Sequence, residues 1–118
     1  MSPARPAKTR RRKGWKASSL DAVERFDALV AVEGAKRGVL FGCPIYVLNG
    51  ERYATLYQGQ IALRLSPDDA AELISNGGRP FEPIKGRKSR DRVVLPETIV
   101  ASPRSLRAWV RKAAAYTR

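Results

Sequence analysis

The side chains best suited to contacting a ligand are arginines and lysines, which gather in three places: a run near the N-terminus, a polar connector and the last predicted helix. They are Arg10, Arg11, Arg12 and Lys13, then Lys85, Arg87, Lys88 and Arg90, and finally Arg104, Arg107 and Arg111, in line with Arg118. Each phosphate that such a cation neutralises releases counterions, so clustered cations give a salt-sensitive affinity that ignores base sequence. The sequence therefore predicts weak nucleic-acid binding at these positions. The alternatives are a solvated basic surface and docking on an acidic protein partner.

The charge is unevenly distributed along the 118 residues. The chain has 23 Lys and Arg against 11 Asp and Glu, a net charge of +12. Residues 1–16 hold seven of these bases and no acid, which leaves 16 bases, 11 acids and a charge of +5 for the rest. Because residues 1–16 also contain prolines and little that is apolar, they cannot offset their ordering entropy by burial. They are predicted to form a disordered tail, and residues 17–118 a single domain.

Several kinds of chemistry are made improbable by the residues that the sequence lacks. It contains no histidine, so nucleophiles activated by histidine and the common zinc sites are not expected. Its lone cysteine, Cys43, is predicted to be a buried apolar side chain and not a reactive thiolate. No enzymatic activity, cofactor or metal is predicted. No apolar run approaches the roughly 20 residues of a membrane helix, so a cytoplasmic protein without membrane contact is expected.

The element that must position the rest is a predicted meander over residues 40–66. Three apolar runs, Cys43–Leu48, Arg52–Tyr57 and Ile61–Leu65, are separated by Asn49-Gly50 and Gln58-Gly59. Both central residues of a type I′ turn need positive φ, which Asn and Gly tolerate best. The pattern therefore predicts three antiparallel strands joined by two tight hairpins.

Two-residue turns also predict which side chains share a face of this sheet. The face toward the core is predicted to hold Cys43, Ile45, Val47, Ala54, Leu56, Ile61, Leu63 and Leu65. The outward face is predicted to hold Tyr46, Tyr53, Thr55, Tyr57, Ala62 and Arg64. Its three tyrosines are interpreted first as pairs that stabilise the sheet. The alternatives are a base-stacking surface, or the interface of a protein–protein adaptor whose basic tail only aids solubility.

Three serines mark the starts of predicted helices. Ser18 or Ser19 caps a helix that continues to about Val32, and Ser66-Pro67 starts a short helix that Asn76-Gly77-Gly78 ends. Ser102-Pro103 starts a final helix that reaches about Tyr116. A fourth strand over residues 93–95 and a turn of helix over residues 97–100 complete the prediction. The fold class is α+β: an antiparallel sheet of three to four strands with helices packed on one face.

With this element order in place, the sequence resembles the N-terminal domain of the TfoX/Sxy family of competence regulators. The resemblance covers roughly residues 19–117 and is carried by the following stretches: residues 36–42 (KRGVLFG), 45–50 (IYVLNG), 61–66 (IALRLS), 78–81 (GRPF) and 94–97 (VLPE), and Leu106, Trp109 and Ala113 of the final helix.

The resemblance implies a compact α+β domain without known catalytic residues. It also implies a role in regulating natural-transformation genes. Founding members of the family promote these genes together with the cyclic-AMP receptor protein. Those regulators have a second, helical domain beyond the point where this sequence ends, and Cys43 stands where the family commonly shows glycine.

Overall fold

The computed structural model describes residues 19–118. The predicted disordered tail over residues 1–16 and the alternative cap at Ser18 lie outside the described residues. Ten elements follow one another within the described part. They are α1 (Leu20–Val30), β1 (Lys36–Leu40), β2 (Cys43–Leu48), β3 (Glu51–Tyr57), β4 (Gln60–Arg64), α2 (Pro67–Ser75), β5 (Arg79–Pro80), β6 (Arg92–Val94), α3 (Glu97–Val100) and α4 (Pro103–Thr117).

The helices begin where the capping residues predicted them. Ser19, Ser66 and Ser102 each accept a hydrogen bond, through the side-chain oxygen, from the backbone N–H three residues later. Pro67 and Pro103 occupy the first turns of α2 and α4. These serines satisfy N–H groups that the helix itself leaves without partners, so the predicted starts are confirmed.

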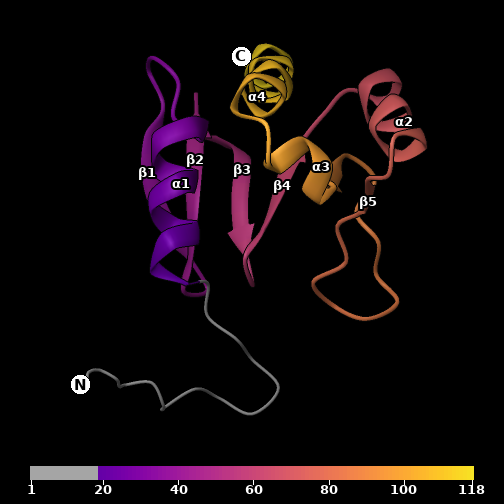
Figure 1. The fold of residues 1–118 in the computed structure, drawn as a ribbon, viewed down its shortest axis with the longest axis horizontal. Coiled ribbons are helices and arrows are strands. Elements are labelled where there is room, and N and C mark those ends of the chain that lie inside the picture. The colour runs from indigo at the N-terminus through magenta and orange to yellow at the C-terminus, as the bar shows by residue number, and fades with distance from the viewer. Residues whose placement is uncertain (1–18) are drawn as a thin grey trace.

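All six strands form one antiparallel sheet in the order β1-β2-β3-β4-β6-β5 (Figure 1). The predicted α+β class is confirmed, whereas the predicted count of three to four strands is too low. The two additional strands are the edges, β1 and β5. β1 begins with two charged residues and a glycine, and β5 has only two residues, one of them proline, so neither shows the apolar alternation that reveals a strand.

Three consecutive hairpins turn on two residues with positive φ. Asn49 and Gln58 have φ of 52° and 51°, and each is followed by a glycine with φ near 80°. These are the two predicted turns. The third, Phe41-Gly42, has the same geometry, with Phe41 at φ 52°. The sequence did not predict this third turn, because phenylalanine rarely adopts positive φ.

All four helices lie on one face of the sheet. The main core joins Phe26 and Val30 of α1, Leu73 of α2, and Leu106 and Trp109 of α4 to strand residues, and α3 packs against it. A separate cluster on the other face contains only Ala62, Phe81 and Val94, with Tyr57 beside it. The predicted layering, with helices on one side only, is therefore confirmed.

A β-bulge changes which tyrosines face this core. Tyr46 pairs with Ala54 but the next residue, Val47, pairs with Arg52, so Tyr53 is an extra residue in β3. Side chains on the two sides of a bulge no longer alternate simply, and Tyr53 points to the same side as Ala54. Tyr46 is 6% exposed and Tyr53 is 0% exposed within the main core.

The predicted faces of β2 and of the start of β3 are therefore wrong. Ile45 pairs with Thr55 on the face away from the helices, and Val47 pairs with Arg52 there. Tyr46, Tyr53 and Tyr57 do not share an exposed surface, because the first two are buried on the helix side. The predictions for Ala54, Leu56, Ile61, Leu63 and Leu65 hold, since all five belong to the main core.

The two buried tyrosines attach α1 to the sheet. The Tyr53 hydroxyl donates to the Val30 carbonyl at 2.8 Å, and the Tyr46 hydroxyl donates to Asp27 Oδ1 at 2.9 Å. The Arg37 guanidinium on β1 contacts the same Asp27 oxygen at 2.8 Å. Burial raises the pKa of Tyr53 to about 12, because a phenolate is poorly solvated there.

We predict that Tyr53→Phe lowers the free energy of unfolding by about 1–2 kcal/mol, because the Val30 carbonyl loses its donor in a buried site. The free energy would be measured by chemical denaturation at neutral pH. Tyr116→Phe is the control, since Tyr116 lies at 40% exposure on α4, and its effect should stay within about 0.5 kcal/mol.

The stability difference between the wild type and Tyr53→Phe is also predicted to depend on pH. The pKa of Tyr53 rises from 10.0 in the unfolded chain to about 12 in the fold. The unfolded state therefore loses this proton first, and the stabilisation is present below pH 10 and is lost as the pH rises toward 12. The stability difference between the wild type and Tyr53→Phe should narrow over that range. A constant difference would contradict a buried neutral phenol.

Candidate functional site

The helix α4 carries one predicted cluster of cations on the side away from its buried arc. Leu106, Trp109, Val110, Ala113 and Ala114 are buried against the sheet and the other helices. Arg104, Arg107 and Arg111 are exposed. Lys112 lies apart from these arginines: its Nζ is 3.7 Å from Asp69 Oδ1 and 5.4 Å from the centre of the Trp109 ring. The helical period thus separates one neutralised cation from three free ones.

A groove of about 650 Å³ lies between α4 and α1. Its apolar lining includes Leu29 and Val32 from α1 and the segment after it, and Val110 from α4. Three arginines of the predicted stripe also line it, namely Arg107, Arg111 and Arg118. Arg118 Nη2 additionally donates to the Glu33 carbonyl at 3.5 Å. An apolar floor with a cationic rim suits a ligand that is both apolar and anionic.

The second predicted cluster lies on the loop between β5 and β6. Lys85, Arg87, Lys88 and Arg90 are all exposed. The loop is held by its own hydrogen bonds: the Gly86 N–H donates to Glu82 Oε2 at 2.6 Å, and the Ser89 N–H donates to the Phe81 carbonyl at 2.8 Å. This loop and α4 project from different parts of the fold (Figure 1). The two clusters therefore form two basic surfaces and not one face.

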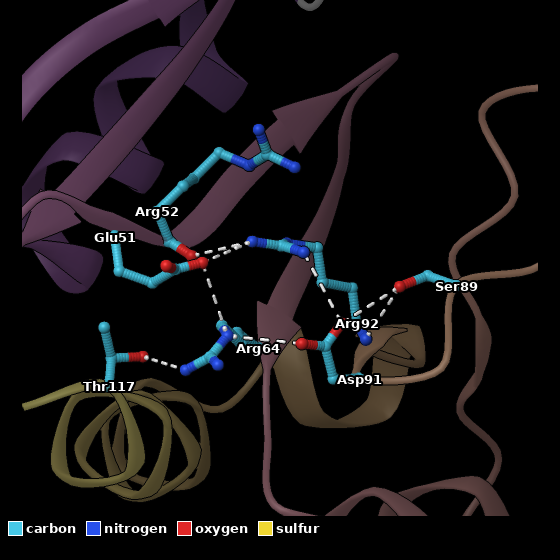
Figure 2. Close-up of polar contacts among 7 residues, drawn as sticks. All are labelled: Glu51, Arg52, Arg64, Ser89, Asp91, Arg92 and Thr117. Atoms are coloured by element: carbon cyan, nitrogen blue, oxygen red, sulfur yellow. Dashed lines mark hydrogen bonds and ion pairs between the residues drawn. The ribbon is translucent and has the colours of Figure 1, made fainter.

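Arginines on the sheet behave differently, because carboxylates surround them (Figure 2). Arg64 and Arg92 are direct cross-strand partners on β4 and β6. Glu51 Oε2 lies 3.6 Å from Arg64 Nε and 3.4 Å from Arg92 Nη2, and Asp91 contacts the same two arginines at 3.2 and 3.4 Å. The Arg64 Nε–H is not aligned for a hydrogen bond with either carboxylate, so the two Arg64 contacts are ion pairs only, whereas Arg92 also donates hydrogen bonds to both carboxylates. Two positive and two negative groups thus cancel locally.

Arg52 is the exception beside this network. Its carbonyl accepts a hydrogen bond from Arg92 Nη2 at 3.1 Å, but its guanidinium points away from the carboxylates (Figure 2). Its Nε is buried without a hydrogen-bond partner among the described residues. Burial, and then the nearby Arg92 charge, lower the pKa of Arg52. The site therefore holds a partly buried cation that forms no ion pair within residues 19–118.

The ion pairs divide the cations of residues 19–118 into two groups. Arg37, Arg64, Arg92 and Lys112 have carboxylate partners. None of the seven predicted binding residues in this range forms an ion pair there: Lys85, Arg87, Lys88, Arg90, Arg104, Arg107 and Arg111. Seven of the 12 cations of residues 19–118 that have no ion pair therefore lie on α4 and the β5–β6 loop. Arg10, Arg11, Arg12 and Lys13 lie outside the described residues.

The remaining predicted sites can now be placed. Cys43 is buried, as predicted, but outside the main core, and burial raises the pKa of its thiol. Tyr57 is half-buried and packs against Phe81 on the face away from the helices. Within residues 19–118 no group of three His, Cys, Asp or Glu side chains is arranged to hold a metal ion. No helix in that range is both long and apolar enough to span a membrane.

Sequence reasoning missed the α1–α4 groove and the arginines of Figure 2. Arg52, Arg64 and Arg92 lie on three different strands, so no local pattern connects them. The signal that was available is that Arg64 is a charged residue inside an apolar run and that Arg92 directly precedes one.

Comparison with known proteins adds no assignment. No protein-family model matches the chain, and no curated protein is significantly similar to it.

The contrast between Arg52 and Arg64 generates a prediction for stability. Arg64→Met should lower the free energy of unfolding by about 1 kcal/mol, because Glu51 and Asp91 each lose a cation at a partly exposed site. Arg52→Met should leave it unchanged within about 0.5 kcal/mol or raise it, because an unpaired buried N–H is removed. Chemical denaturation of both variants measures the difference. A larger loss for Arg52→Met would mean that its guanidinium has a stabilising partner.

Proposed function

We propose that this chain is a non-enzymatic domain of the TfoX N-terminal type that binds nucleic acid weakly, through phosphate contacts. The observation that supports this proposal is that some cations have carboxylate partners and others have none. The seven exposed bases of α4 and the β5–β6 loop have no ion pair within residues 19–118, whereas Arg64 and Arg92 of the sheet are neutralised by Glu51 and Asp91. Free, exposed cations are the groups that release counterions when they meet phosphate. The N-terminal bases Arg10 to Lys13 would add to the same attraction.

The predicted affinity is electrostatic and independent of base sequence. No side chain of α4 is arranged with others as a reader of base edges, and arginines spaced along one helix face can follow a phosphate backbone. A role in regulating transcription or competence, which the resemblance to the TfoX/Sxy family implies, would then require a partner that supplies sequence specificity. The proposal therefore concerns an accessory DNA-contacting domain.

We predict that Arg107→Gln and Arg111→Gln each weaken binding to duplex DNA and lower the slope of log affinity against log salt by about one, because each removes about one phosphate contact. Affinity would be measured by fluorescence anisotropy at roughly 50 and 200 mM salt. Lys36→Gln is the matched control: Lys36 is exposed on the edge strand β1, away from both clusters, and loses the same charge.

Equal effects of the three substitutions would show that only net charge matters and that α4 is not a binding surface. Absence of binding by the unaltered chain at the lower salt would overturn the proposal. A full-length variant with Arg10, Arg11, Arg12 and Lys13 all changed to Gln measures the contribution of the tail.

The α1–α4 groove favours a second candidate function, that of a protein–protein adaptor. Its apolar floor and the rim of Arg107, Arg111 and Arg118 fit the apolar and acidic sides of an amphipathic helix. This surface replaces the tyrosine face as the adaptor site, because Tyr46 and Tyr53 are buried.

A substitution that fills the groove without changing its charge distinguishes the adaptor function from nucleic-acid binding. Ala28 is exposed on α1 and lines the groove, so Ala28→Trp should block an acidic amphipathic peptide and leave DNA affinity unchanged, because Arg107 and Arg111 lie on α4. Ala71→Trp is the control, because Ala71 is exposed on α2 and this variant adds the same indole outside the groove. Anisotropy with a labelled Glu-rich helical peptide measures the first effect. If that peptide binds neither the wild type nor the control, the adaptor function is excluded.

A further inference from the structure

A hollow of about 340 Å³ opens on the face of the sheet that the helices leave uncovered. Its lining comes from β3, β4, β6 and the short edge strand β5, and it lies beside the basic β5–β6 loop. The residues that matter for its chemistry are Tyr57, Gln60, Arg79, Phe81, Glu82 and Lys88. An aromatic ring, an amide and two cations thus meet in one concave site. The α1–α4 groove has no aromatic lining residue.

The aromatic ring is fixed in position and still accessible. Phe81 is buried against Ala62 and Val94, and its ring centre lies 5.5 Å from that of Tyr57 at an interplanar angle of 79°. This edge-to-face contact is a preferred geometry for aromatic pairs. Tyr57 remains half-exposed and lines the hollow. A ring held in this way loses little side-chain freedom when a flat ligand stacks on it.

The polar groups around the ring suit a nucleotide. Arg79 and Lys88 are exposed and form no ion pair within residues 19–118, so both are free to contact phosphate. Gln60 is exposed and offers both a donor and an acceptor, as the edge of a base requires. Glu82 is the one carboxylate of the hollow, and it is engaged by the Gly86 N–H of the loop. Two cations against one anion leave the site positive.

We propose that this hollow receives an unpaired base of single-stranded nucleic acid, which stacks on Tyr57 while Arg79 and Lys88 contact the flanking phosphates. The inference rests on the proposed nucleic-acid binding and adds a preference for single strands to it. Bases in a duplex are already stacked and paired, so they cannot reach the Tyr57 ring. Single-strand binders use this combination of a stacking ring and a cationic border.

The test compares two probes and two variants of the full chain. The probes are an oligothymidylate of about ten nucleotides, within the range of known single-strand sites, and a duplex of equal length. Tyr57→Leu removes the ring and keeps an apolar side chain. It should weaken binding of the single strand roughly tenfold and leave duplex binding unchanged. Tyr116→Leu, at an exposed tyrosine on α4, should change neither affinity.

The outcomes separate this inference from the proposed function. If the chain binds both probes with equal affinity and Tyr57→Leu changes neither affinity, the single-strand site is overturned. General phosphate binding is then still supported. Absence of binding to either probe at roughly 50 mM salt overturns both. Thymidine monophosphate that binds as tightly as the oligonucleotide overturns the assignment to a strand, because the ligand would then be a free nucleotide.

A second measurement needs no substitution and so does not depend on the folding of a variant. An oligonucleotide that carries 5-bromouracil would be crosslinked to the full chain by light, and the modified peptide identified by mass spectrometry. Crosslinks at Tyr57 or Phe81 support the proposal. Crosslinks confined to α4 or to the N-terminal residues overturn it.

Discussion

The fold depends on the bulge in β3, because it turns Tyr53 toward the helix side next to Ala54. Without the extra residue, the sheet would present Tyr53 to the uncovered face and leave α1 without its buried hydrogen bond to the Val30 carbonyl. Tyr46 adds a second contact to α1 through Asp27, and Phe26 packs against the Tyr46 ring at 5.5 Å. Since α1 forms one wall of the groove with α4, this local irregularity also holds the wall that faces the arginine rim.

Charge compensation is the second constraint, and it acts selectively. The carboxylates of Glu51 and Asp91 lie where Arg64 and Arg92 enter the sheet, so cations at partly buried positions have partners. Exposed cations on α4 and on the β5–β6 loop need no partner for stability, because water solvates them. Their lack of partners is therefore compatible with folding and leaves them free to bind an anion. Arg52 lies between these cases, with a buried Nε and no acceptor in the described part of the chain.

The sequence was sufficient for features that depend on neighbours along the chain. Ser19, Ser66 and Ser102 mark helix starts because capping involves a residue three positions away. Asn49-Gly50 marks a turn because positive φ is a property of those residues themselves. The cationic stripe of α4 follows from the helical period alone. The resemblance to the TfoX/Sxy family stays a prediction, because its motifs are structural and no family model matches.

The wrongly predicted faces and the turn that was not predicted have one physical origin, which is contact between segments that are distant in the sequence. A bulge shifts the register by one residue, and no local pattern announces it, so Ile45, Val47, Tyr46 and Tyr53 were all assigned to the wrong face. Phe41-Gly42 turns because β1 and β2 pair on either side of it, which overrides the preference of phenylalanine for negative φ.

The uncovered face shows why such errors matter for function. Once Tyr46 and Tyr53 are buried under the helices, the predicted row of three tyrosines is reduced to Tyr57 alone. Its partner there is Phe81, which follows the short edge strand and gave no sign in the sequence of lying beside β3. A single ring with two cations in the same hollow suits one base, whereas three rings would suit a run of bases. The register of one strand pair therefore decides how much of a nucleic acid this face could hold.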